Sequence, residues 1–68
     1  MPIITIQQFP GRTPQQKQKL AEHITRAVRE VYGPTAQAVQ VVIQEIQPDD
    51  WFAEGVPART LPRTYGQS

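Results

Sequence analysis

The residue of greatest chemical interest in this sequence is Pro2, which directly follows Met1. An initiator methionine is readily removed when the next residue is small, and its loss would convert the Pro2 nitrogen from a non-basic amide into a secondary amine. Burial of this amine in an apolar pocket disfavours its charged form and lowers its pKa, and a nearby arginine lowers the pKa further. An amine tuned towards neutral pH can both accept and return a proton. Pro2 alone is weak evidence for catalysis, because a proline can follow Met1 by chance.

Signatures of other enzyme classes are missing from the sequence. It contains no glycine-rich phosphate loop, no nucleophile elbow and no cysteine–histidine pair. There is no cysteine, which excludes disulfides, and the one histidine, His23, has no clustered metal ligands around it. We therefore expect no metal site. We expect His23 at the surface or at the margin of the core, and Glu45 in a subunit contact or in solvent.

Charge and hydropathy argue against two further classes of function. The net charge is only +1, from 7 Lys and Arg against 6 Asp and Glu, so the chain lacks the basic footprint of a nucleic-acid-binding protein. No apolar run approaches the roughly 20 residues that span a bilayer, and no basic and apolar secretion signal is recognisable. We expect a cytoplasmic protein that binds neither nucleic acid nor membrane.

Two strands are expected to flank a helix. Residues 3–8 are rich in β-branched side chains and predict the first strand, and residues 39–46 predict the second. A right-handed crossover through the helix would make these strands parallel. A short hairpin is expected near residues 51–58, where glycine and proline interrupt the chain.

The intervening helix carries clear signals at both ends. Thr13 predicts the N-cap, Pro14 suits the first helical position, and Gln16 completes a capping box. Gly33 predicts a left-handed stop. Apolar residues at helical spacing form one stripe along the helix: Leu20, Ile24, Ala27, Val28 and Val31.

The predicted fold class is α+β, with one β-α-β domain over residues 1–68 and a proline-rich tail over residues 58–68. A chain of 68 residues buries only about 60% of its unfolded surface, so it is marginal as a monomer. Two strands under one helix also leave strand edges and an apolar face open. We therefore expect a homo-oligomer, in which two protomers pair into a four-stranded sheet with two helices. The tail is expected to be flexible or to pack on a neighbouring subunit.

The segment from Pro2 to Leu20, PIITIQQFPGRTPQQKQKL, resembles the start of the 4-oxalocrotonate tautomerase family. The resemblance combines Pro2 and an isoleucine-rich strand with Gly11-Arg12-Thr13, and it covers about residues 2–55. Further matching residues are Gln16 and Lys17 in the helix, Glu45 in the second strand, and Trp51 and Gly55 in the loop. The family implies an isomerase without cofactor or metal that assembles as a hexamer, a trimer of dimers.

The resemblance also implies roles for individual residues. Pro2 matches the family's catalytic amino-terminal proline, which would move a proton in a small enol or dienol carboxylic acid. Arg12 matches an arginine that binds the substrate carboxylate, a role suited to its planar fork of donors. Trp51 aligns with an aromatic residue that walls the pocket, and Phe52 is a second candidate for the same wall.

Gln40 departs from the family's pattern, because tautomerases of this family usually carry a second arginine there. A neutral amide can still donate a hydrogen bond to the oxygen where charge develops, but it supplies no charge. Arg59 and Arg63 could replace the arginine across a subunit boundary, although both are more typical of surface residues.

Two other functions remain open from the sequence. Relatives that hydrate or dehalogenate 3-substituted acrylates carry a carboxylate that activates water. The matching position here is Ala53, with Asp50 and Glu54 beside it. A non-catalytic assembly module is the other alternative, and it would apply if Met1 stays attached and keeps the Pro2 nitrogen acylated.

Overall fold

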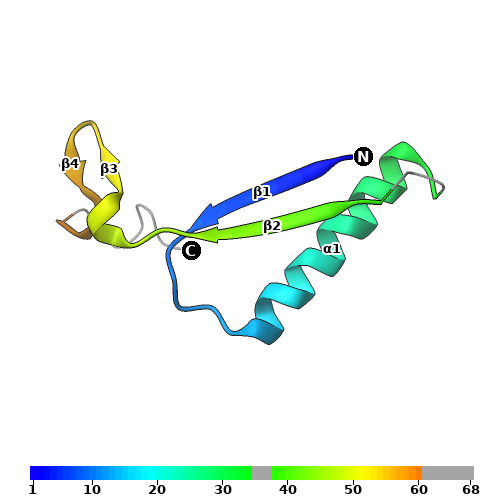
Figure 1. The fold of residues 1–68 in the computed structure, drawn as a ribbon, viewed down its shortest axis with the longest axis horizontal. Coiled ribbons are helices and arrows are strands. Elements are labelled where there is room, and N and C mark those ends of the chain that lie inside the picture. The colour runs from blue at the N-terminus through cyan, green and yellow to red at the C-terminus, as the bar shows by residue number, and fades with distance from the viewer. Residues whose placement is uncertain (35–37, 61–68) are drawn as a thin grey trace.

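The chain folds as a strand, a long helix and a second strand, followed by a small hairpin (Figure 1). The computed structural model describes residues 1–34 and 38–60. The elements in chain order are β1 Ile3–Gln8, α1 Pro14–Tyr32, β2 Gln40–Glu45, a 3₁₀ turn Pro48–Asp50, β3 Phe52–Ala53, β4 Val56–Pro57 and a second 3₁₀ turn Ala58–Thr60. The predicted β-α-β order is confirmed, and the hairpin lies inside its predicted range.

Strands β1 and β2 form a parallel pair, as the crossover rule predicted. The register runs from Ile3 opposite Gln40 to Gln8 opposite Glu45. Side chains alternate between two faces, because successive residues of a strand point in opposite directions. One face is half-buried and apolar; its central rows pair Ile4 with Val41 and Ile6 with Ile43.

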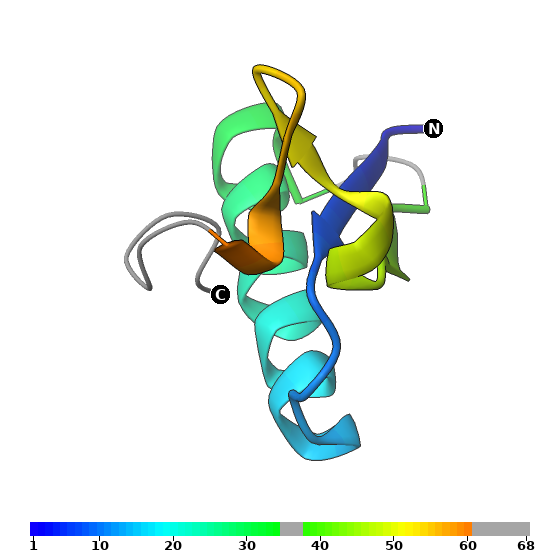
Figure 2. The same cartoon turned by 90° about the vertical axis from the view of Figure 1, so that its left-hand side faces the viewer.

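The opposite face of the β1–β2 pair is exposed. Its rows pair Ile3 with Gln40, Thr5 with Val42, and Gln7 with Gln44. Figure 2 shows α1 on one side of the two strands, and the described ranges place no second helix on the other side. Parallel sheets are normally covered on both faces, so a parallel pair with one open face is unusual.

Helix α1 begins as predicted. Thr13 is the N-cap, and its side-chain oxygen accepts a hydrogen bond from the Gln16 N–H (3.1 Å). The Gln16 side chain accepts one in return from the Thr13 N–H (3.0 Å), so both halves of the capping box are present. At the other end the Gly33 N–H donates to the Arg29 carbonyl (2.8 Å).

Gly33 ends α1 in a different conformation from the predicted left-handed one. Its φ of 104° is positive, but its ψ of 154° lies outside the left-handed helical region. Side chains rarely adopt this combination, because a Cβ atom would crowd the backbone. The helix therefore stops at Gly33 by leaving helical geometry altogether.

Across residues 1–34 and 38–60, no helix is long and apolar enough to cross a membrane.

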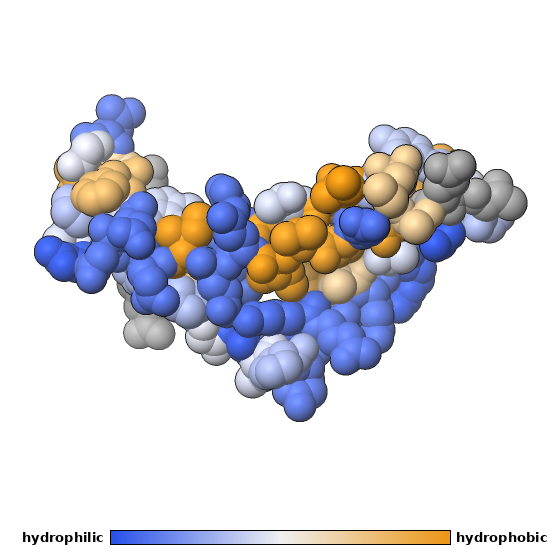
Figure 3. Space-filling view, viewed as in Figure 1, coloured by the Kyte–Doolittle hydropathy of each residue, from blue (hydrophilic) through white to orange (hydrophobic). Residues whose placement is uncertain are grey.

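A single chain has almost no core of its own. Within the described residues only Ala58 is fully buried, at 5% exposure. Large apolar residues that remain exposed are Met1, Ile3, Leu20, Val31, Tyr32, Val42, Phe52 and Val56. The radius of gyration is 14.8 Å, against about 11 Å for a compact chain of this length. Apolar residues gather across the middle of the face in Figure 3, between hydrophilic margins. Exposed apolar surface of this extent is rare on monomeric soluble proteins.

Candidate active site

Pro2 and Gln40 lie together at the start of the two parallel strands. The Gln40 N–H donates to the Pro2 carbonyl (3.0 Å), which extends the β1–β2 ladder by one bond. The Gln40 side-chain Nε2 donates to the Met1 sulfur (3.3 Å). The structure thus places Pro2 beside Gln40, the position where the family resemblance leads us to expect an arginine. With Met1 attached, as here, the Pro2 nitrogen is an amide.

An apolar cleft of about 440 Å³ adjoins Pro2. It lies between the start of β1 and the last turns of α1. Its other lining residues are Ile3, Ile4, Ala27, Val28, Val31 and Tyr32. None of these side chains is charged at neutral pH. An amine at Pro2 would therefore adjoin a surface that offers its ammonium form little solvation, which favours the basic neutral form.

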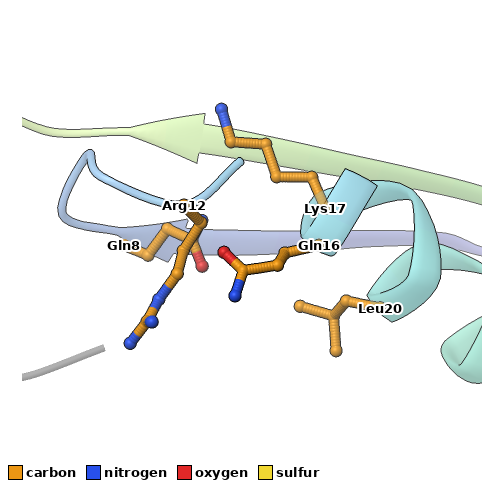
Figure 4. Close-up of a pocket in the computed structure, with 5 residues that line it drawn as sticks. All are labelled: Gln8, Arg12, Gln16, Lys17 and Leu20. Carbon is orange, nitrogen blue, oxygen red and sulfur yellow. The ribbon is translucent and has the colours of Figure 1, made fainter. Parts of the chain in front are cut away.

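Arg12 lies at the opposite end of β1, in the connection to α1. It borders a second cleft, of about 310 Å³, together with Gln8, Gln16, Lys17 and Leu20 (Figure 4). Lys17 reaches towards β2, where its Nζ pairs with the Glu45 carboxylate (2.6 Å). Arg12 is exposed, and no hydrogen bond or ion pair joins its guanidinium to another residue in the described ranges. Its charge is thus available to an anionic ligand.

Trp51 also lies at the Arg12 end of the strands. Its ring meets the Phe9 ring edge to face, with centroids 4.7 Å apart and planes at 82°. The Trp51 carbonyl accepts a hydrogen bond from the Ala58 N–H (2.8 Å), which anchors the hairpin that follows. Phe52 is 59% exposed. Sequence reasoning did not single out Phe9, although its position directly after the first strand was an available signal.

The predicted site residues therefore fall into two groups, at opposite ends of the β1–β2 strand pair of one chain. Pro2 and Gln40 form one group, and Arg12, Trp51 and Phe52 lie at the other end. The six residues of β1 separate them, which at about 3.3 Å per residue is about 20 Å. A small carboxylic acid cannot span that distance. A site that uses both Pro2 and Arg12 must take them from different chains.

The acids beside the predicted water-activating position are on the surface. Ala53 lies in β3 and has no carboxylate. Glu54 occupies the tip of the β3–β4 hairpin, where Glu54 (φ 54°) and Gly55 (φ 78°) both have positive φ, the requirement of a two-residue type I′ turn. Glu54 and Asp50 are both exposed.

The other residues considered from the sequence, as far as the structure describes them, are exposed on the surface or belong to a local turn. Arg59 pairs with Asp49 (2.8 Å), and its side chain is 61% exposed, so it behaves as a surface residue. Residues 58–60 of the predicted tail form a 3₁₀ turn on their own chain, whereas Arg63 and residues 61–68 lie outside the described residues. His23 is exposed on α1. In the described residues, no three acidic or histidine side chains gather as metal ligands would.

Comparison with known proteins shows which family has this fold and these residues. The family model for tautomerase enzymes matches residues 2–60, beginning at Pro2. The chain belongs to the tautomerase family. It is similar to 2-hydroxymuconate tautomerase of Bacillus subtilis (strain 168), with 36% identity over 55 residues, which is 81% of this chain and 89% of the relative.

Solved structures agree with the family assignment. TomN, a 4-oxalocrotonate tautomerase homologue of the tomaymycin biosynthetic pathway, superposes with a TM-score of 0.78 at 33% identity, covering 98% of this chain and all of that one (100%). A heterohexamer 4-oxalocrotonate tautomerase from Chloroflexus aurantiacus gives 0.76 at 27% identity, with 91% and 100% covered. The 4-oxalocrotonate tautomerase fold predicted from the sequence is thereby confirmed, and a tautomerase-type isomerase is supported.

Proposed function

We propose that this protein is a tautomerase of small enol or dienol carboxylic acids, and that the Pro2 nitrogen is its general base and acid once Met1 is removed. The observation that carries the proposal is the position of Pro2 beside an apolar cleft without charged lining residues. Such surroundings favour an uncharged amine, which is the form that can accept a proton.

The proposed reaction moves one proton and leaves the substrate's composition unchanged. The amine of Pro2 takes the proton from the enol hydroxyl, so the O–H bond breaks and a C=O bond forms. The electron pair of the carbon–carbon double bond, or of the conjugated diene, then takes the same proton from the ammonium at carbon. The product is a ketone, which is α,β-unsaturated when the substrate is a dienol. No cofactor or metal takes part in this scheme.

Arg12 is the proposed carboxylate-binding residue, supplied by a different chain from the one that supplies Pro2. Its guanidinium can bind a carboxylate through two parallel hydrogen bonds. Trp51 and Phe52 lie at the same end of the chain as Arg12, so they would reach the Pro2 of the neighbour together with it. There they would wall the pocket and exclude water, which strengthens the electrostatic interactions inside.

An oligomer satisfies both this geometry and the missing core. We propose that two single-domain protomers pair into a four-stranded sheet with two helices and that three such pairs form a hexamer. The large exposed apolar residues supply the surface to be buried. The heterohexameric structural neighbour supports an assembly of this size.

In the proposed site, Gln40 determines how much negative charge the substrate can carry at the Pro2 end. An arginine there would balance a second negative charge on the substrate, whereas an amide carries no charge and offers hydrogen bonds alone. The proposed substrates are therefore small acids that react through one carboxylate and an uncharged carbonyl end. Phenylenolpyruvate has this form.

The test compares purified wild-type protein with Pro2→Ala. Intact mass first establishes whether Met1 is absent, and absorbance then follows ketonisation of phenylenolpyruvate and 2-hydroxymuconate. Loss of a general base typically costs about 10²- to 10⁴-fold in rate, so we expect a loss of that size with an unchanged circular dichroism spectrum. Retained Met1, or equal rates for the two proteins, would contradict the proposal and favour a non-catalytic module or a different base.

A further inference from the structure

The Gln16 side-chain amide uses its oxygen in the helix cap, whereas its nitrogen has no hydrogen-bond partner among the described residues. Its Oε1 accepts the Thr13 N–H (3.0 Å). The backbone N–H can only donate, so it fixes which end of the amide faces it. Nε2 must then point away from the helix end. No hydrogen bond occupies Nε2 in the described part of the chain.

The free half of this amide faces the same cleft as Arg12. Figure 4 shows the Gln16 Nε2 and the Arg12 guanidinium extending to one side of the cleft, whereas Lys17 extends the other way, towards β2. Lys17 is also paired with Glu45 (2.6 Å). With Lys17 paired, the side-chain donors that remain for an anion in this cleft are the Arg12 guanidinium and the amides of Gln16 and Gln8. Of the two amides, only that of Gln16 has its oxygen held by a hydrogen bond, which fixes the direction of its Nε2.

We propose that the Gln16 amide is a substrate-binding group that donates Nε2–H to the same carboxylate that Arg12 binds. This inference rests on the proposed function. A carboxylate has two oxygens with about four acceptor positions, and a bidentate arginine uses only two of them. Gln16 offers a further donor, and the capping box holds it in place before the substrate arrives, so little side-chain entropy is lost on binding.

Gln16→Glu separates this role from the capping role. Glutamate keeps the capping box and adds favourable charge at the helix N-terminus, so the melting temperature should stay equal or rise. It removes the Nε2 donor and places a negative charge beside Arg12. Losing a hydrogen bond to a charged group corresponds to at least about a tenfold weaker interaction, so KM for phenylenolpyruvate should rise by about that factor or more.

Gln15→Glu is the matched control. It makes the same charge change one residue earlier in the same helical turn, but Gln15 does not line the cleft. Its KM should stay within about twofold of wild type, because solvent screens an exposed charge. Gln16→Met removes the donor without adding charge and should also raise KM. A wild-type KM for Gln16→Glu, with Pro2→Ala inactive, would show that Gln16 is only a cap and would leave the proposed function intact.

A binding measurement tests the inference without relying on turnover. Phenylpyruvate is titrated into ¹⁵N-labelled wild-type protein, and the side-chain amide resonances are followed by NMR. The Gln16 Nε2–H₂ signals should shift in a saturable way, while those of Gln15 should not. If they shift in a protein that shows no tautomerase activity, the inference stands and the proposed function is wrong. Unmoved Gln16 signals at high ligand concentration, whether or not the ligand binds, would refute the inference.

Discussion

Activity should be restored by mixing two inactive variants, because Pro2 and Arg12 lie at opposite ends of one chain. The six-residue strand β1 holds them about 20 Å apart, so the proposed site, which uses both residues, would combine Pro2 of one subunit with Arg12 of another. Pro2→Ala removes the base and Arg12→Ala removes the carboxylate-binding residue. Each variant keeps the group that the other variant lacks.

The size of the recovery follows from counting subunits. Pro2→Ala alone should retain at most about 1% of the rate, the loss typical of a missing general base. Arg12→Ala alone should retain at most about 10% of kcat/KM, the loss typical of a charged hydrogen bond. In an equal, randomly assembled mixture, a site receives an intact Pro2 half the time and an intact Arg12 half the time. About one quarter of the sites are then wild type.

The assay is co-refolding of the two variants from denaturant at equal concentrations, followed by phenylenolpyruvate ketonisation. We expect about 25% of the wild-type kcat/KM from shared sites, against about 5% if each subunit worked alone and only the Arg12→Ala half contributed. Each variant refolded by itself is the control for recovery of structure. Activity that never exceeds the average of the two separate variants would refute the two-chain site.

Three further substitutions test other parts of the structure. Gln40→Arg supplies a charge at the Pro2 end and should raise kcat/KM for 2-hydroxymuconate relative to phenylenolpyruvate by about tenfold; an unchanged ratio in steady-state assays would show that Gln40 does not face the substrate. Val31→Glu places a charge on an apolar residue that is 78% exposed in one chain. It should dissociate the proposed hexamer in sedimentation experiments, whereas Arg26→Glu, on the polar face of α1, should not. Thr13→Ala removes half of the capping box and should lower the free energy of unfolding by about 1 kcal/mol, measured by urea denaturation at one fixed protein concentration.

The local elements could be predicted because their signals lie within a few residues of one another. The capping box of Thr13 and Gln16 is satisfied inside a single helical turn, so the sequence specifies where α1 begins. The β-branched run over residues 3–8 likewise predicts β1. The stop at Gly33 was placed correctly, but its conformation was not, because φ and ψ there depend on where the chain goes next.

The partnerships between distant residues could not be read from the sequence. The edge-to-face contact of Trp51 with Phe9, and the pairing of Lys17 with Glu45, each join residues far apart in the chain. Such contacts depend on the register of β1 against β2, which the strands alone leave open. The direction in which the Gln16 Nε2 points follows from the hydrogen bond between its Oε1 and the Thr13 N–H, which only the structure shows.

The sequence by itself determined the β-α-β order, the tautomerase resemblance and the candidate residues Pro2, Arg12 and Gln40. Tertiary structure alone decided how those residues are distributed. Parallel pairing places Pro2 beside Gln40, and the length of β1 carries Arg12 to the far end. The sequence states which side chains are present and in what order. Their distances in space depend on the strand register and on the path of the crossover, and both are set by long-range packing.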